Sequence, residues 1–276
     1  MSTFQAIVYG IIHGFAEFVP ISANAHDQLV PYLLGWPAPT GVMTGALAFG
    51  AMLSLFLYFR HDWASIISCF LQVLIFRKRP MTLDERLPLF MALTSAPAAI
   101  VWYYLHEQLI QASWSPLVVA GLTAGFALPL LSTESFSRKN KGMFDWTWLD
   151  ALLLGIAEIA AFIPGCGRMT ALLPAALLRN FNREAAAKYA FFASMPFLAA
   201  SATFWLRGLD FHAAQPMADT SWLSFAMAVL VTTLTGLLAI GGFMKHIQSR
   251  GFGQYAVYRL MMAGVVAGIW WLRRGA

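Results

Sequence analysis

The chain has 276 residues, of which 59% are hydrophobic and only 11% are charged, and its mean hydropathy is +0.64. Soluble domains carry roughly 25% charged residues, so this composition excludes an ordinary soluble protein and favours one that lipid solvates. The net charge of +5 is not gathered into a basic segment, so the sequence lacks the clustering that nucleic-acid binding needs.

Apolar segments long enough to cross a bilayer recur along the chain, because a helix needs about 20 residues to span the hydrocarbon core. Six of them predict spanning helices: 41–59, 87–105, 116–132, 185–206, 222–244 and 255–272. The shorter run 63–76 predicts a tilted or interfacial helix. The sequence therefore predicts an all-α, multi-pass integral membrane protein that forms one membrane domain over residues 1–276.

Two further apolar segments are interrupted by proline and polar residues. Residues 4–19 lead into Pro20 and then a short apolar piece at 29–36, while residues 148–163 lead into Pro164 and then 169–178. Proline removes a backbone donor and disfavours helix in the residue before it. Each segment therefore predicts a helix, a break and a second helix, which together make a re-entrant pair.

The two broken segments also resemble each other. GFAE at 14–17 precedes the first break, and GIAE at 155–158 precedes the second. Paired interrupted helices of this kind point to an inverted repeat whose site lies at the repeat interface. The sequence thus predicts a helix bundle made of two repeats, at about 1–140 and 141–276.

Loop charges predict the orientation, because Lys and Arg are retained on the cytoplasmic side of a membrane. Basic residues flank the loops near 77–86 and 138–141, and two spans separate these loops. The intervening loop at 106–115 has no Lys or Arg, so we expect it outside the cytoplasm. Arg273 and Arg274 then fall on the outer side, against the rule.

The breaks are candidate anion sites. Irregular backbone at membrane depth survives only where protein or a water-filled cavity satisfies it. A half-helix that begins at a break also aims free N–H groups and a positive dipole end into the cavity. Gly165 and Gly167 permit the backbone conformations that such a break requires.

Ionisable residues beside the breaks are candidate functional residues, because charge within a membrane is costly. Glu17 and Glu158 precede the breaks, and Arg168 presents a planar fork of donors that suits a phosphate. An alternative is that Glu17 and Arg168 pair across the repeat and hold its halves together. His13 lies four residues before Glu17 and so shares its helix face.

Three more residues are candidates on weaker grounds. His26 follows the first break with Asp27 beside it, although a histidine near a helix end is usually structural. Arg259, at the start of the last span, is a second candidate for phosphate binding. Its alternative is a side chain that extends to the membrane interface.

The motifs that contain these residues resemble the bacterial undecaprenyl-diphosphate phosphatases of the bacitracin-resistance type, over nearly the whole chain. The first motif of that family is EGxxE followed by PVSSTGH, and here it reads HGFAE at 13–17 and PISANAH at 20–26. The second is PGxSRSG, which here reads PGCGRMT at 164–170. A late Tyr-Arg pair at 258–259 supports the resemblance.

The resemblance implies an inverted-repeat fold in the bacterial inner (cytoplasmic) membrane, often as a homodimer. It implies that Arg168 grips the diphosphate while Glu17 and His26 share acid–base work or nucleophilic attack. Further substrate-binding positions that it implies are Ser22, Asn24, Gly165, Gly167, Thr170 and Arg259. It also implies a divalent cation, Mg²⁺ or Ca²⁺, in many members, with Glu17 as the candidate metal ligand.

Departures from the family pattern leave two functions open. His13 stands where the family has a Glu, and Gly167 and Met169 replace the two Ser residues that flank the motif Arg. Losing a Glu is expected to weaken a metal site, because hard cations take several oxygen ligands. One expected function is hydrolysis of a polyprenyl diphosphate to the monophosphate, for lipid-carrier recycling. The other is a binding protein or transporter that holds a polyprenyl phosphate without cleaving it.

Overall fold

The computed structural model describes residues 1–39, 41–77, 79–207, 209 and 220–274. These residues are mostly helical, and the β contact found among them is one isolated bridge between Lys141 and Phe181. In chain order the elements are α1 (Thr3–Ala16), α2 (Ala23–Leu34), α3 (Val42–Tyr58), α4 (Arg60–Phe76), α5 (Leu83–Gln111), α6 (Pro116–Gly125), α7 (Ala127–Phe136), η1 (Met143–Asp145), α8 (Trp148–Glu158), η2 (Ile159–Phe162), α9 (Arg168–Leu178), α10 (Arg183–Leu206), α11 (Trp222–Ser249) and α12 (Gly253–Arg274).

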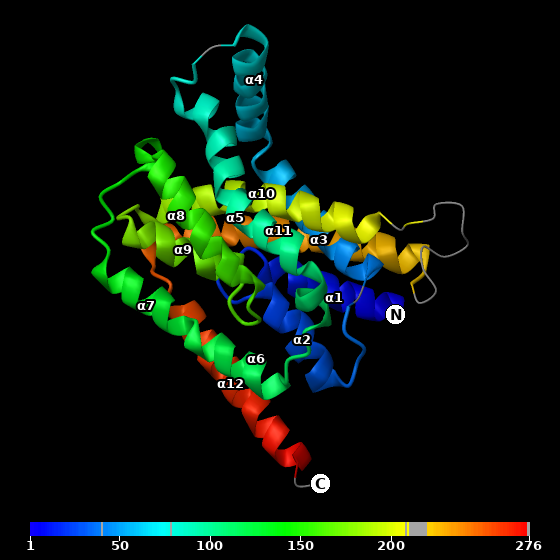
Figure 1. The fold of residues 1–276 in the computed structure, drawn as a ribbon. Coiled ribbons are helices and arrows are strands. Elements are labelled where there is room, and N and C mark those ends of the chain that lie inside the picture. The colour runs from blue at the N-terminus through cyan, green and yellow to red at the C-terminus, as the bar shows by residue number, and fades with distance from the viewer. Residues whose placement is uncertain (40, 78, 208, 210–219, 275–276) are drawn as a thin grey trace.

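Five of the six predicted spanning segments correspond to helices long enough to cross a membrane, and the sixth, 41–59, forms a shorter helix. Within the described residues, α5, α10, α11, α12 and the continuous α6–α7 pair are long and apolar enough to cross a membrane. Helix α3 has 17 residues and is followed by α4 after a bend of 85°. Figure 1 shows α4 and the start of α5 projecting from the rest of the bundle. The protein is therefore an all-α, multi-pass membrane protein, and α4 turns away from α3 as the prediction for 63–76 requires.

The two predicted breaks are confirmed. Helix α1 ends before Pro20 and α2 begins after it, while α8 and η2 end before Pro164 and α9 begins after it. In Figure 1 the pair α1–α2 and the pair α8–α9 lie on different sides of the bundle. The inverted relation between the halves, and the division into repeats near residue 140, stay predictions.

Side-chain caps explain where several helices begin. The Thr82 hydroxyl accepts the Glu85 N–H at the start of α5, and Thr147 caps α8 through Asp150 in the same way. Each cap satisfies backbone donors that have no partner inside the helix, and it stabilises the helix by about 0.5–2 kcal/mol. The polar residues that interrupt the apolar runs therefore set the ends of the spans.

Glycines bring α1 and α3 close to α11. A Cβ added at Gly14 of α1 would lie 2.7 Å from the carbonyl oxygen of Thr232, and one at Gly50 of α3 would lie 2.7 Å from that of Val229. Small residues allow this close approach, which drives helix association in membranes where lipid is as apolar as the side chains. Glu17, at the end of α1, is consequently positioned by α11.

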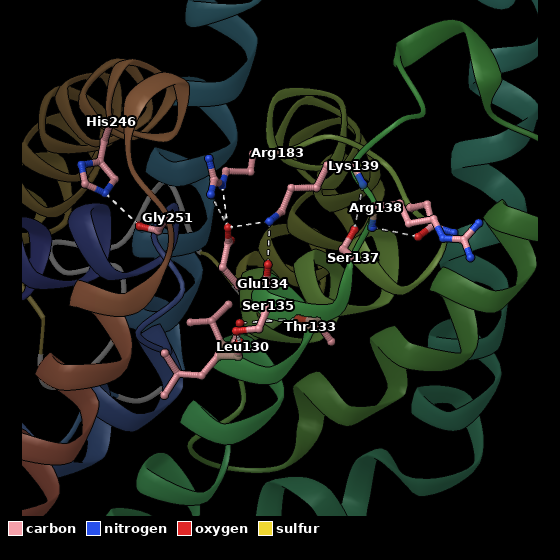
Figure 2. A network of polar contacts seen from close by, with 12 residues as sticks. Leu130, Thr133, Glu134, Ser135, Ser137, Arg138, Lys139, Arg183, His246 and Gly251 are labelled. Atoms are coloured by element: carbon pink, nitrogen blue, oxygen red, sulfur yellow. Dashed lines mark hydrogen bonds and ion pairs between the residues drawn. The ribbon is translucent and has the colours of Figure 1, made fainter.

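Charged residues form a network at one end of the bundle. Figure 2 shows the Glu134 carboxylate between Arg183 and Lys139, with Arg183 Nε donating to Glu134 Oε1 at 2.8 Å. His246 near the end of α11 donates from Nε2 to the carbonyl of Gly251, in the turn before α12, at 3.2 Å. These contacts tie α7, α10 and the loop at 137–142 together at the basic end of the molecule.

Candidate functional site

The two breaks meet in the middle of the protein. Ser22 immediately precedes α2 and Gly167 immediately precedes α9, and both have positive φ, 74° and 75°. A Cβ added at Gly167 would lie only 2.8 Å from the Ser22 Cα, so this position requires glycine for space as well as for conformation. The N-termini of two helices therefore converge, each with backbone N–H groups that have no partner inside its helix. This arrangement favours an anion.

Arg168, the first residue of α9, lies at this junction and forms an ion pair with Glu17 from the end of the first helix. The Phe197 ring lies over its guanidinium, with Cζ 4.3 Å from the ring centroid. Both charged side chains are 9% exposed. The pairing that the sequence suggested across the two halves is thus confirmed. Arg168 Nε is buried with no hydrogen-bond partner among the described residues, so it is free for a ligand.

The pair lines one cavity, and a second cavity shares two lining residues with the first. A small one of about 30 Å³ is lined by Glu17, Ala23, Asn24, Ala161, Gly167, Arg168 and Phe197. A large one of about 720 Å³ has mainly apolar walls, with aromatic residues at Trp102, Trp114, Phe162, Phe197 and Trp205. Asn24 and Phe197 line both cavities, so they form the boundary between a charged pocket and an apolar one.

Arg259 lies in the protein interior, so the interface alternative for its side chain is wrong, and its phosphate-binding role stays a prediction. Its side chain is fully buried, so it does not extend to the membrane interface. It donates from Nε to the Thr123 carbonyl at 2.9 Å, and from Nη1 to the Pro20 carbonyl at 3.1 Å and to Thr170 Oγ1 at 2.9 Å. Nη2 donates to the Gly165 carbonyl. Arg259 therefore holds both breaks in place beneath the site, and Thr170 and Gly165 act as its partners.

His26 lies outside the lining of both cavities. Its Nδ1 donates to the Ser22 carbonyl at 2.8 Å, and its ring stacks on that of Tyr258 in α12. Because a carbonyl only accepts, Nδ1 carries the proton in the neutral ring, and Nε2 then accepts the Tyr258 hydroxyl at 2.7 Å. Neither cavity described above is lined by His26. The acid–base role that the resemblance implies for His26 stays a prediction.

The opposite face of α2 points into the large cavity instead. Asn24, Asp27 and Gln28 line that cavity, and Asn24 also donates to the Ala161 carbonyl at 3.3 Å. Asp27 accepts a hydrogen bond at 2.9 Å from His13 Nδ1. The polar residues after the first break are therefore divided between two faces of one helix.

Buried polar atoms without a partner gather around this site. Within the described part of the chain they include His13 Nε2, Asp27 Oδ1, Arg168 Nε and both carboxylate oxygens of Glu158. Glu158 is 0% exposed, and the charge of Arg168 acts on it. Buried polar groups normally have a partner, so such a concentration marks a place where water or a ligand completes the bonding.

Sequence reasoning gave no role in the site to two residues of this region. Phe197 covers Arg168, and Tyr258 holds His26. Phe197 is one of 22 phenylalanines, so composition does not distinguish it. Tyr258 stands beside Arg259, and only the packing of α12 against α2 shows which groups the two side chains reach.

The residues present do not form a metal site made by the protein alone. No group of three or more His, Cys, Asp or Glu side chains able to hold a cation occurs in the part of the chain that the structure describes. Glu17, the candidate ligand, already pairs with Arg168. Hard cations take six or more oxygen ligands, which this donor set does not supply.

The sequence matches the family model described as "Bacitracin resistance protein BacA" over residues 6–265. It is 31% identical to an undecaprenyl-diphosphatase of Moorella thermoacetica over 274 residues, which cover 99% of this chain and 100% of that protein. It is 33% identical to an undecaprenyl-diphosphatase of Idiomarina loihiensis over 266 residues, 96% of this chain and 98% of the relative. The family-model match and the two motifs together show that the chain belongs to the BacA family.

Proposed function

We propose that this protein hydrolyses undecaprenyl diphosphate to undecaprenyl monophosphate and inorganic phosphate. The similar proteins named undecaprenyl-diphosphatase match it over nearly their whole length. One structural observation carries the proposal. An arginine stands at the meeting point of two helix N-termini, at the edge of a large apolar cavity. These are the groups that a phosphate attached to a long hydrocarbon chain requires.

Arg168 binds the diphosphate in this proposal. Its guanidinium donates to Glu17 from Nη2, and Nε has no partner among the described residues. A phosphate oxygen would accept a hydrogen bond from Nε. The small pocket of about 30 Å³ has room for only about two water molecules. Binding of a diphosphate therefore requires the Glu17–Arg168 pair to open, which releases the Glu17 carboxylate beside the substrate. Arg168 and the helix N–H groups then stabilise charge that develops on the phosphoryl oxygens.

The large cavity receives the part of the lipid nearest the headgroup. Its volume of about 720 Å³ and its tryptophan-rich wall suit an isoprenoid chain. A lipid placed there brings its phosphates to the boundary formed by Asn24 and Phe197. The lipid chain and the charged pocket would thus meet at this boundary.

The proposal includes an orientation. The large cavity is lined by Pro39 and by Ala112 and Trp114, which lie in loops outside the basic network around Glu134. Because basic loops stay in the cytoplasm, we place the mouth of the cavity on the outer side of a bacterial inner membrane. The enzyme would there return the lipid carrier of peptidoglycan synthesis to its monophosphate form.

Two further parts of the proposal concern partners. Mg²⁺ commonly binds through one or two carboxylates together with substrate phosphates, so a divalent cation would have to arrive with the diphosphate. No step above depends on it. A homodimer, as the resemblance implies, also remains part of the proposal.

The test is phosphate release from undecaprenyl diphosphate by the detergent-purified protein, with Mg²⁺, with Ca²⁺ and with a chelator. Arg168→Ala is expected to abolish release and lipid diphosphate binding, and Glu17→Gln to lower release by about 100-fold or more. Arg207→Ala, on the exposed end of α10, is the matched control and is expected to behave like wild type. Folded wild-type protein that binds the lipid but releases no phosphate would refute hydrolysis and leave the binding protein or transporter.

A further inference from the structure

His13 is held in a defined orientation one helical turn before Glu17, which lines the small pocket, although His13 itself lines neither cavity. It lies in the last turn of α1, four residues before Glu17, and is 6% exposed. Its Nδ1 lies 2.9 Å from Asp27 Oδ2, and Asp27 lines the large cavity. Residues four apart lie on the same helix face. The His13 ring therefore lies on the same side of α1 as Glu17, whose carboxylate pairs with Arg168.

The bond to Asp27 decides which ring nitrogen of His13 is basic. A carboxylate accepts hydrogen bonds, so Nδ1 carries the proton in the neutral ring and Nε2 keeps a lone pair. Nε2 is buried and has no partner among the described residues. The charged groups that act on the ring are Asp27, Glu17 and Arg168. An oriented proton acceptor therefore lies one helical turn from Glu17.

A purely structural tie between α1 and α2 explains this arrangement less well. Such a tie would be expected to satisfy its buried polar atoms, yet Asp27 Oδ1 and His13 Nε2 both lack a partner within the described ranges. His26 shows the contrast, since both of its ring nitrogens are hydrogen-bonded by protein groups. Of these two histidines, His13 alone has a ring nitrogen left for a water molecule.

We propose that His13, oriented by Asp27, is the general base of the reaction; this inference rests on the proposed function. Nε2 takes a proton from a water molecule, and the water oxygen forms a bond to the terminal phosphorus. The bond from that phosphorus to the bridging oxygen breaks, and its electron pair leaves with the undecaprenyl monophosphate. The imidazolium, stabilised by the Asp27 carboxylate, afterwards releases its proton to solvent. Asp27 is a positioning residue.

The experiment compares kcat and KM for undecaprenyl diphosphate in wild type, His13→Gln, Asp27→Asn and His26→Gln, with His61→Gln as an exposed control. His13→Gln is expected to lower kcat by about 100-fold or more. KM is expected to change by less than about threefold, because the base acts in the transition state rather than in binding. Asp27→Asn is expected to lower kcat by about tenfold or more at similar KM. His26→Gln and His61→Gln are expected to lose less kcat than either of these variants.

A double variant, His13→Glu with Asp27→Asn, tests the role by rescue. It restores a proton acceptor without placing two carboxylates side by side, and it is expected to recover at least about tenfold of the kcat lost in His13→Gln. Because the amide at position 27 can also donate to the carboxylate at position 13, recovered kcat supports the base only where His13→Gln unfolds at the wild-type temperature. Thermal unfolding of each variant accompanies the kinetics.

The outcomes separate this inference from the function on which it rests. Wild-type protein without phosphate release refutes the hydrolysis itself. Active wild type with a His13→Gln variant of near-normal kcat, or with a larger kcat loss in His26→Gln than in His13→Gln, refutes only the role of His13. If His13→Gln does not fold, Asp27→Asn decides: an unchanged kcat overturns the proposal, and a selective kcat loss supports it.

Discussion

Arg259 in the last helix donates a hydrogen bond of 3.1 Å to the backbone carbonyl of Pro20, which lies 239 residues earlier in the chain. The same guanidinium binds the carbonyls of Thr123 and Gly165. A buried acceptor that loses its donor costs about 1–3 kcal/mol. Arg259→Met is therefore expected to lower the free energy of unfolding by at least about 3 kcal/mol, as measured by thermal or denaturant unfolding in detergent.

Arg273→Met is the matched control for that prediction. Arg273 also donates to two carbonyls, those of Tyr32 and Leu33, but from an exposed position. Water can replace the lost donor there, so the expected change is below about 0.5 kcal/mol. Equal effects of the two substitutions would contradict the role assigned to Arg259.

Gly14→Ala is expected to separate α1 from α11. The added Cβ would lie 2.7 Å from the Thr232 carbonyl oxygen, which is backbone and cannot move aside alone. Overpacking of this kind costs about 1–3 kcal/mol, and it also displaces Glu17 from Arg168. Gly121→Ala, where a Cβ meets nothing within 4 Å, should leave stability and phosphate release unchanged. Unfolding temperature and phosphate release measured on both variants check this prediction.

Glu158→Gln is expected to strengthen diphosphate binding. The carboxylate is fully buried, has no partner within the described residues, and acts on Arg168. Removing a negative charge near the arginine favours an anion there, so the dissociation constant should fall by about 2- to 10-fold. Equilibrium binding of undecaprenyl diphosphate measures this, with the exposed Glu107→Gln as control. Weaker binding in Glu158→Gln would show that this carboxylate assists the substrate.

Ala200→Trp is expected to fill part of the large cavity. Ala200 lines it from α10, and an indole there would compete with the isoprenoid chain for space. Affinity for undecaprenyl diphosphate should fall by about tenfold or more. Losing the burial of a piece of the lipid chain as large as an aromatic side chain costs at least about 1.4 kcal/mol of binding free energy. Inhibition by inorganic diphosphate should stay the same. Ala226→Trp, exposed on α11, is the control; unchanged lipid affinity in Ala200→Trp would place the chain elsewhere.

The sequence was sufficient to locate the helices and their breaks. Pro20 and Pro164 interrupt apolar runs through covalent geometry, which acts locally and so can be read from neighbouring residues. The Glu17–Arg168 pair was also foreseeable, because two opposite charges at membrane depth have few other partners.

The direction of individual side chains could not be predicted in the same way. His26 and Asp27 are adjacent, yet one meets Tyr258 of α12 and the other meets His13 of α1. Their separation depends on how α2 is rotated between its neighbours, and a short helix with polar residues on both faces does not define that rotation. The partners of Arg259 could not be predicted for a related reason, since three of them are backbone carbonyls that no residue type identifies.

The ion pair between Glu17 and Arg168 joins groups that are synthesised 151 residues apart. At ribosomal rates of about 5–20 residues per second, the arginine follows the glutamate by about 8–30 s. During that interval the nascent chain holds a carboxylate with no counter-ion in or near the bilayer. We therefore expect the first helical hairpin to reach its final place only after the second has been inserted, and a chain truncated before residue 168 to be inactive.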